Sequence, residues 1–152
     1  MKYRVVEKFI SVNGEGRLAG QLAVFIRFAG CNLRCSYCDT KWANEESVEF
    51  EEMSEKEIYD FIKETSITNV TLTGGEPLIQ KGIEPLLLLL TDDKQLNVEI
   101  ETNGSIELLR FLKIIQGKAV FTMDYKLQSS SMKNAMKLNN FEYLRPNDTV
   151  KF

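Results

Sequence analysis

Hydrophobic residues occur along this chain in short continuous runs that alternate with segments of helical periodicity. Residues 21–29 contain Val24, Phe25, Ile26 and Phe28 with almost no polar interruption, a pattern typical of a strand buried on both faces. Similar runs predict further strands at residues 3–10, 69–73, 98–102 and 118–124. Strands separated by helices of about ten residues indicate a parallel sheet, because parallel strands need such crossover connections.

The predicted helices lie between these strands and place the chain in the α/β class. Ser54-Glu55-Lys56-Glu57 has the form of a capping box and precedes apolar residues at helical spacing, so a helix is expected to begin there. A second helix is expected at about residues 82–91, with Pro85 tolerated in its first turn. A third is expected over residues 105–115. Its hydrophobic face comprises Ile106, Leu109 and Leu112.

Unusual residues follow each of the later predicted strands. The segments are Gly74-Gly75-Glu76-Pro77, Glu101-Thr102-Asn103-Gly104 and Asp124-Tyr125-Lys126. In a parallel α/β sheet or barrel, ligands bind at the carboxyl ends of the strands, so these segments are expected to meet at one mouth. After Lys126 the chain becomes polar and irregular, and a final extended segment is expected at residues 148–152.

Composition favours a globular protein that handles a small molecule. The chain has 152 residues, 43% of them hydrophobic, and 19 basic against 22 acidic residues give a net charge of −3 without any block of like charge. Neither nucleic acid nor an anionic membrane surface is therefore implied as a partner. The longest apolar run, residues 85–90, is far shorter than the roughly 20 residues of a membrane span, and no signal peptide is recognised, so a cytoplasmic protein is expected.

All three cysteines of the chain, Cys31, Cys35 and Cys38, lie in one short loop after the strand at residues 21–29. Thiolates are soft ligands for iron and zinc, and crowding in one loop argues against a disulfide framework. The chain has no His and no fourth Cys, so neither the four-thiolate nor the three-thiolate-plus-imidazole zinc set can form. A cluster bound here would keep one open iron; the alternatives are a zinc knuckle or inert buried thiols.

The spacing Cys-x3-Cys-x2-Cys, with aromatic Tyr37 before the last cysteine, resembles the signature of the radical S-adenosylmethionine (SAM) superfamily. The flanking residues 11–16, 25–30 and 38–43 narrow the resemblance to the 7-carboxy-7-deazaguanine synthase family. The resemblance covers essentially the whole chain. It implies a partial (βα) barrel of radical SAM type with mostly parallel strands, and a single core domain over residues 1–152. Relatives usually continue for another strand and helix, so the chain is expected to lack the last βα elements.

The resemblance also implies roles for individual residues. Cys31, Cys35 and Cys38 would hold a 4Fe-4S cluster as the catalytic centre, and the hydroxyl of Thr40 would bind Mg2+. The residues expected at SAM are Tyr37, Asp39, Gly75, Glu76, Asn103, Asp124, Tyr125 and Lys126. The residues expected at the substrate are Val12, Asn13, Gly14, Arg27 and Thr73. Relatives often have Gln where this chain has Asn13.

Arg27 is notable without any resemblance, because it interrupts a hydrophobic strand. A buried charge without a partner costs several kcal/mol, so Arg27 is expected either to pair with an internal carboxylate such as Glu15 or Glu101 or to await an anionic ligand. A guanidinium matches a carboxylate bidentately.

The reaction implied by the resemblance is the conversion of 6-carboxy-5,6,7,8-tetrahydropterin to 7-carboxy-7-deazaguanine with loss of ammonia, on the route to queuosine and related deazapurines. The reduced cluster would cleave SAM to a 5′-deoxyadenosyl radical that removes hydrogen from this pterin substrate. A reductant of the flavodoxin or ferredoxin type would be needed, and a homodimer is common in the family.

Two other functions stay open from the sequence. One is an activating protein that installs a glycyl radical on a partner such as anaerobic ribonucleotide reductase; such activases are similarly short and share the cysteine loop. The other is a non-catalytic module, a truncated fragment that binds the cluster or SAM without turnover. A large exposed apolar docking surface would favour the activase, whereas Arg27 and the turn at residues 13–16 favour a small carboxylated substrate.

Overall fold

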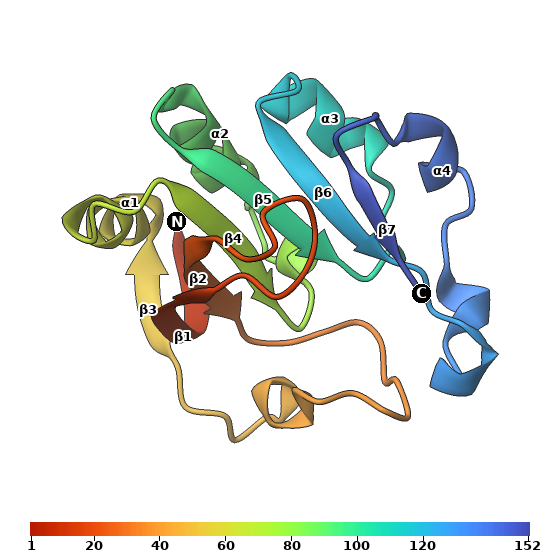
Figure 1. Ribbon diagram of the computed structural model, residues 1–152. Helices are drawn as coiled ribbons and strands as arrows, with labels where there is room; N and C mark the ends of the chain where they lie inside the picture. Colours follow the sequence, from red (N-terminus) through yellow and green to blue (C-terminus); the bar gives the residue numbers. More distant parts are fainter.

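The strand that delivers the cysteine loop, β2 (Leu22–Phe28), lies inside a seven-stranded sheet with the order β3-β1-β2-β4-β5-β6-β7 (Figure 1). The computed structural model describes residues 1–152. The other strands are β1 (Lys2–Val12), β3 (Glu51–Ser54), β4 (Asn69–Gly74), β5 (Asn97–Thr102), β6 (Ala119–Asp124) and β7 (Thr149–Lys151).

The sheet is mostly parallel. All neighbours from β2 through β7 run parallel, whereas β1 pairs antiparallel with both β2 and β3. The predicted α/β class and every predicted strand are confirmed. β3 was not predicted, because its sequence is short and largely charged; it forms by pairing with the first residues of β1 and buries only Met53.

Three helices cover one face of the sheet: α1 (Glu55–Glu64), α2 (Glu84–Asp92) and α3 (Leu109–Ile115) (Figure 1). The predicted capping box is present, since Ser54 accepts a hydrogen bond from the backbone of Glu57 and donates its own N–H to the Glu57 carboxylate at 2.7 Å. The remaining helical segments are short. They are α4 (Asn140–Tyr143) and the 3-10 turns Lys41–Asn44, Pro77–Ile79, Gln128–Ser130 and Lys133–Ala135.

The third helix is shorter than predicted, and its most deeply buried residues are not those of the predicted hydrophobic face. Residues 105–108 are held by side-chain amides instead of helical hydrogen bonds: Asn103 Oδ1 accepts from the Ser105 N–H at 2.9 Å and Asn140 Oδ1 from the Leu108 N–H at 3.0 Å. The helix therefore begins at Leu109. The residues that enter the core are Leu108, Phe111 and Ile115, whereas Ile106, Leu109 and Leu112 are only partly buried.

The sheet curves away from its helices, so that the turn after β1 comes close to β7 on the face without helices. Lys151 of β7 lies 2.7 Å from both carboxylate oxygens of Glu15, which follows β1. This contact agrees with the expected partial (βα) barrel. Within the described structure, no helix combines the length and the hydrophobicity that crossing a bilayer requires.

Candidate active site

The carboxyl ends of the parallel strands open into one cavity of about 900 Å³. Its wall includes the cysteine loop on one side and charged side chains of β5, β6 and β7 on the other. The predicted site residues that line it are Asn13, Gly14, Arg27, Cys31, Cys35, Tyr37, Cys38, Asp39, Thr40, Thr73, Gly75, Asn103, Asp124 and Lys126. The expected meeting of the strand ends at one mouth is therefore confirmed.

The three cysteines are free thiols, each half-buried, on the loop after β2. Ser36 anchors this loop to the 3-10 turn Gln128–Ser130, which follows β6. Its N–H donates to Ser130 O at 3.0 Å and its hydroxyl donates to Ser129 O at 2.6 Å. Burial raises the pKa of the Cys31 and Cys35 thiols above the ordinary value. Both thiols are therefore protonated near neutral pH until a metal binds and displaces the proton.

The donor set around the thiols distinguishes a single metal ion from a cluster. No three Cys, Asp or Glu side chains lie close enough together to hold one ion. Around one tetrahedral ion, with metal–sulfur bonds of about 2.3 Å, the sulfurs would lie less than about 4 Å apart. The chain has neither a His nor a fourth Cys, so the complete structural zinc sets cannot form, whereas a cluster completed by a small molecule needs only these three thiols.

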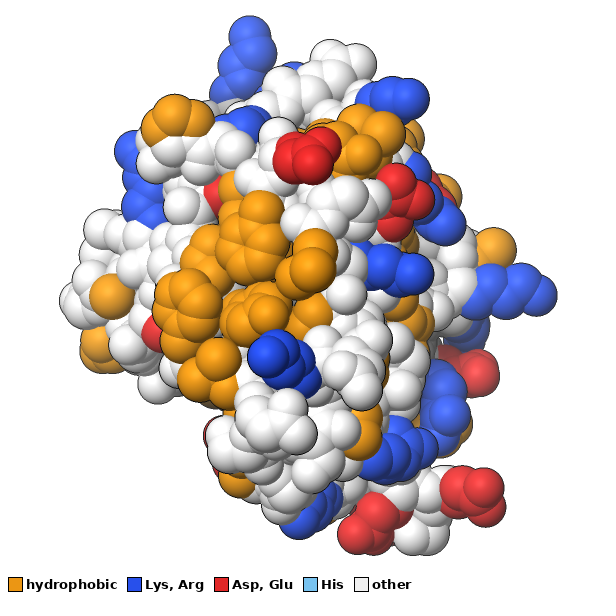
Figure 2. All heavy atoms as spheres, turned by 90° about the vertical axis from the view of Figure 1, so that its right-hand side faces the viewer, with side chains coloured by type: hydrophobic (Ala, Val, Ile, Leu, Met, Phe, Trp, Pro, Cys, Tyr) orange, Lys and Arg blue, Asp and Glu red, His pale blue; other side chains and the backbone are white.

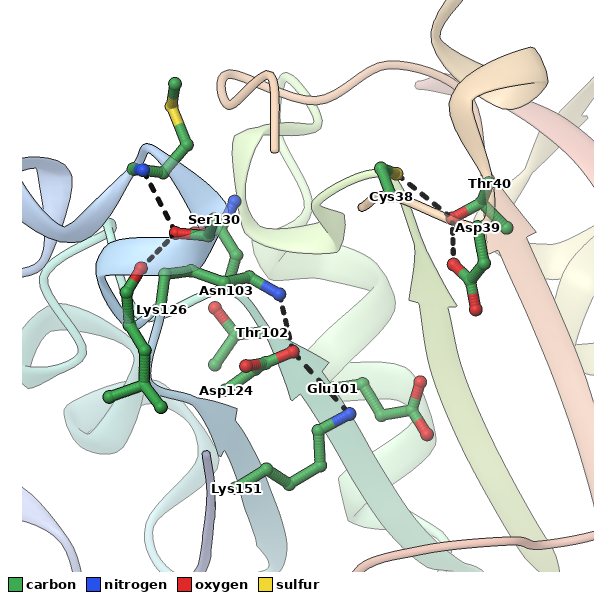
Figure 3. Close-up of polar contacts among 12 residues, drawn as sticks. Cys38, Asp39, Thr40, Glu101, Thr102, Asn103, Asp124, Lys126, Ser130 and Lys151 are labelled. Atoms are coloured by element: carbon green, nitrogen blue, oxygen red, sulfur yellow. Dashed lines mark hydrogen bonds and ion pairs between the residues drawn. The ribbon is translucent and has the colours of Figure 1, made fainter. Parts of the chain in front are cut away.

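Hard oxygen atoms lie directly beside the last cysteine (Figure 3). Thr40 Oγ1 donates to Asp39 Oδ1 at 3.1 Å and lies 3.7 Å from Cys38 Sγ. Oxygen donors of this kind suit Mg2+, which binds through few protein ligands.

The Gly-Gly-Glu-Pro turn after β4 packs tightly against the start of the cysteine loop. A Cβ at Gly75 would overlap Gly30 O and Asn44 Oδ1, so only glycine fits there. Asn44 Oδ1 is buried and has no hydrogen-bond partner. The backbone of Gly75 and this free acceptor thus lie together at the cavity wall.

Glu76 does not face the cavity. Its fully buried carboxylate accepts hydrogen bonds from Leu78 N at 3.0 Å, Asn103 N at 2.7 Å and the Thr102 hydroxyl at 3.0 Å. Burial raises the pKa of Glu76 to about 7, against these three donors, which lower it. Glu76 therefore fixes the end of β5 and, through it, Asn103, whose Nδ2 lies 3.5 Å from Cys31 Sγ.

A network of charges forms the wall opposite the cysteine loop (Figure 3). Asp124 accepts from Lys126 Nζ at 2.5 Å and lies 3.6 Å from Lys151 Nζ. Glu101 accepts from the Thr73 hydroxyl at 2.5 Å. Burial, together with the nearby carboxylate of Glu15, raises the pKa of Glu101 to about 7 although Thr73 and Lys151 lower it.

Arg27 lines the cavity, and it pairs with a carboxylate other than the two examples that the sequence suggested. Its Nε donates to Glu7 Oε2 at 2.8 Å, whereas Glu15 pairs with Lys151 and Glu101 with Thr73. The reason is the pairing of β1 with β2, which sets Glu7 directly opposite Arg27.

The predicted substrate turn is only partly at the cavity. Asn13 is almost fully buried and donates through Nδ2 to Glu99 Oε2 at 2.6 Å and Thr71 Oγ1 at 3.1 Å. Gly14 lines the cavity, whereas Val12 lies outside its lining with an exposed side chain.

Tyr125 also lies outside the cavity lining. Its ring packs against Phe141 at a centroid distance of 5.6 Å and against Phe152 at 5.9 Å. Figure 2 shows hydrophobic side chains gathered on this side of the molecule, where α4 and β7 lie. The side chain of Tyr125 therefore packs with the exposed rings of Phe141 and Phe152 and not at the cavity.

Several lining residues were not predicted as site residues. Phe9 and Phe25 stack at a centroid distance of 5.0 Å beside Arg27, and Glu15, Glu101 and Lys151 add charge. Glu101 belongs to a segment that was expected at the mouth but was given no role, and Lys151 stands at the carboxyl end of a strand, a signal that could have identified it. Phe9 and Phe25 look like core residues in the sequence, and nothing in their pattern marks them as cavity residues.

Comparison with known proteins gives one consistent result. Residues 25–147 match the radical SAM superfamily. The whole chain is 62% identical to 7-carboxy-7-deazaguanine synthase of Clostridium acetobutylicum and covers 68% of that protein. It is 34% identical over 147 residues to the synthase of Thermoplasma acidophilum, again covering 68% of the relative.

A solved structure agrees at the level of fold. The crystal structure of QueE from Escherichia coli superposes with a TM-score of 0.66 at 23% sequence identity, covering 99% of this chain and 82% of that one. From the sequence matches, the chain belongs to the 7-carboxy-7-deazaguanine synthase family of the radical SAM superfamily.

Proposed function

We propose that this chain converts 6-carboxy-5,6,7,8-tetrahydropterin to 7-carboxy-7-deazaguanine with loss of ammonia, as a step toward queuosine and related deazapurines. The observation that carries the proposal is that one cavity holds both the three-cysteine loop and the guanidinium of Arg27. A soft-metal site and a carboxylate-binding cation thus face the same enclosed space.

The superfamily implies a 4Fe-4S cluster and SAM, and the residues present fit both groups. Three thiols supply soft ligands, and the site needs no fourth protein ligand if a small molecule completes it. Gly74 and Gly75 line the cavity next to the cysteine loop, so their backbone carbonyls are available to the ammonium group of a ligand bound there. When bound, cluster and SAM supply the radical chemistry.

The side chains around the loop would orient SAM. Tyr37 is half exposed at the cavity and offers its ring to the adenine, while Lys126 Nζ lies 5.9 Å from the ring centroid. Asp39, Asn103 and Asp124 offer acceptors to the hydroxyl and ammonium groups of SAM. Glu76 and Tyr125 would act indirectly, Glu76 by holding Asn103 and Tyr125 by holding the segment between Asp124 and Lys126.

The substrate would bind at the β1–β2 side of the cavity. Arg27 would receive its carboxylate, with Thr73, Asn13 and Gly14 around the ring system and Val12 contributing through the backbone that leads into the turn. Thr40, with Asp39 beside it, would hold Mg2+ against the substrate oxygens. A one-electron donor of the flavodoxin or ferredoxin type and a homodimeric assembly complete the proposal.

An anaerobic assay tests the proposal directly. Iron-reconstituted protein is incubated with dithionite, SAM, Mg2+ and 6-carboxy-5,6,7,8-tetrahydropterin, and 5′-deoxyadenosine and deazaguanine are both followed by mass spectrometry. We expect 7-carboxy-7-deazaguanine in the wild type and its loss in Arg27→Gln. SAM cleavage without that product, from protein with a full cluster, would refute the substrate assignment and favour an activase.

A further inference from the structure

We propose that Glu7 is a positioning residue that aims the guanidinium of Arg27 at the anionic group of the ligand in the cavity. The inference rests on the proposed function, because it concerns how the carboxylate of the substrate is recognised. It assigns a role to a residue outside the cavity lining.

An irregularity in β1 places Glu7 next to Arg27. Val5 pairs with Phe28, but the next pair is Glu7 with Arg27, so β1 carries one extra residue, Val6, relative to β2. Such a β-bulge changes which face the following side chains occupy. Without it, Glu7 would share the face of Val5, which is the face of the hydrophobic core.

The side chains on either side of the bulge confirm the change of face. Tyr3 and Val5 lie in the core under the helices. Beyond the bulge, Phe9 lines the cavity, while Lys8 contacts Met53 Sδ at 3.8 Å on the opposite side. The extra residue thus turns Glu7 and Phe9 toward the face of the sheet that carries Arg27.

The contact itself leaves the binding edge of Arg27 free. Glu7 Oε2 accepts only from Nε, at 2.8 Å, and neither Nη1 nor Nη2 has a hydrogen-bond partner. The Arg27 side chain is 18% exposed and faces the cavity, and the Phe9 ring lies 5.8 Å from its Cζ. A carboxylate on Nε limits rotation of the planar guanidinium, so the two Nη groups are held ready for a bidentate ligand.

Two substitutions of Glu7 distinguish the orientation of the Arg27 guanidinium from the neutralisation of its charge. Glu7→Gln removes the negative charge but keeps an oxygen that can accept from Nε at the same reach. Glu7→Asp keeps the charge but is one methylene shorter. If Glu7 acts by positioning, Gln preserves ligand binding and Asp weakens it. If Glu7 acts only by neutralising Arg27, Asp preserves binding and Gln strengthens it, because Arg27 then attracts the anionic ligand without competition.

The measurement is equilibrium binding, followed by quenching of pterin fluorescence, in cluster-reconstituted protein with SAM. The probes are 6-carboxypterin and pterin, which lacks the carboxylate. We expect Glu7→Asp to weaken binding of 6-carboxypterin about tenfold and binding of pterin less than about twofold, since only the carboxylate meets Arg27. Glu7→Gln is expected to stay within about threefold of the wild type.

Glu51→Ala is the matched control. The Glu51 carboxylate pairs with Lys8 Nζ at 2.6 Å. Lys8 follows Glu7 in β1, but this ion pair points away from the cavity. Loss of Glu51 should therefore change neither the affinity for 6-carboxypterin nor the affinity for pterin. Equal losses for both probes in Glu7→Asp, or unchanged binding of 6-carboxypterin, would overturn the inference. A wild type that binds neither probe would instead overturn the proposed substrate class and with it the premise.

Discussion

The two faces of one sheet differ sharply in chemistry. On the face covered by helices, the central strands present only hydrophobic side chains, all fully buried: Val24, Ile26, Val70, Leu72, Ile100 and Phe121. On the cavity face, strands β4 to β6 present hydroxyls and carboxylates: Thr71, Thr73, Glu99, Glu101, Thr122 and Asp124. Successive residues alternate between the faces, so each strand serves both.

The cavity face opposes stability where the helix-covered face supplies it. Glu99 is fully buried with no cation on it, and it is satisfied only by Thr122 Oγ1 at 2.5 Å, Asn13 Nδ2 at 2.6 Å and Thr71 Oγ1 at 3.5 Å. Burying a carboxylate in this way costs free energy that apolar side chains would not. Gly16 packs directly on Glu99, where a Cβ would overlap Oε1. The polar face therefore costs stability, as expected of a surface that is kept for binding and chemistry.

Loss of one proposed cluster ligand on the cavity side is expected to have the largest effect on activity. The Cys35 thiol makes no hydrogen bond, so Cys35→Ala removes a ligand and little else. We expect iron content after reconstitution and product formation to fall to background. The free energy of unfolding of the metal-free protein should change by less than about 0.5 kcal/mol. Iron and sulfide analysis with urea unfolding checks this, and a variant with full iron content would contradict the cluster assignment.

Substitution of two neighbouring residues of β4, one on each face of the sheet, tests whether the helix-covered face supplies stability and the cavity face supplies activity. Leu72→Ala leaves a cavity in the core and should cost about 2 to 5 kcal/mol, while activity per folded molecule is unchanged. Thr73→Val keeps the shape but removes the hydroxyl that donates to Glu101, so it should cost about 1 kcal/mol and lower product formation about tenfold. Urea unfolding and product assays on both variants check this. Similar effects of the two changes on both readouts would refute the division of roles.

The helix-covered face and the metal loop could be predicted from the sequence, because both depend on local patterns. Continuous apolar runs identified the strands, and the cysteine spacing with the Gly-Gly-Glu-Pro turn pointed to the cavity where these segments meet. In each case, the residues that make up the signal lie within a few positions of one another in the sequence. The helix start at Ser54 was predicted for the same reason, since a capping box is local.

The misjudged features all depend on contacts distant in sequence. The partner of Arg27 follows from a one-residue bulge that exists only when β1 pairs with β2. Glu76 turns away from the cavity because its donors, Thr102 and Asn103, lie on another strand end. Residues 105–108 are not helical because Asn140, more than 30 positions on, occupies the Leu108 N–H. Pattern and propensity do not encode such pairings.

The last expected effect concerns stability and not activity: a pH dependence that comes from Glu101 on the cavity face. The pKa of Glu101 rises from its ordinary value of 4.5 to about 7 in the folded protein, mainly through burial. The folded state therefore holds a proton that the unfolded chain releases between about pH 4.5 and pH 7. This contribution to stability is fully present below about pH 4.5 and is lost as the pH rises through 7.

Glu101→Gln removes the titrating group while keeping an acceptor for Thr73. From about pH 5 to pH 8, the wild type should lose on the order of 2 to 3 kcal/mol more unfolding free energy than the variant. Glu76, whose pKa is also raised to about 7, is present in both proteins, so the difference isolates Glu101. Urea unfolding at both pH values checks this. Parallel pH profiles would mean that Glu101 stays ionised in the folded protein, with Lys151 and Thr73 outweighing its burial.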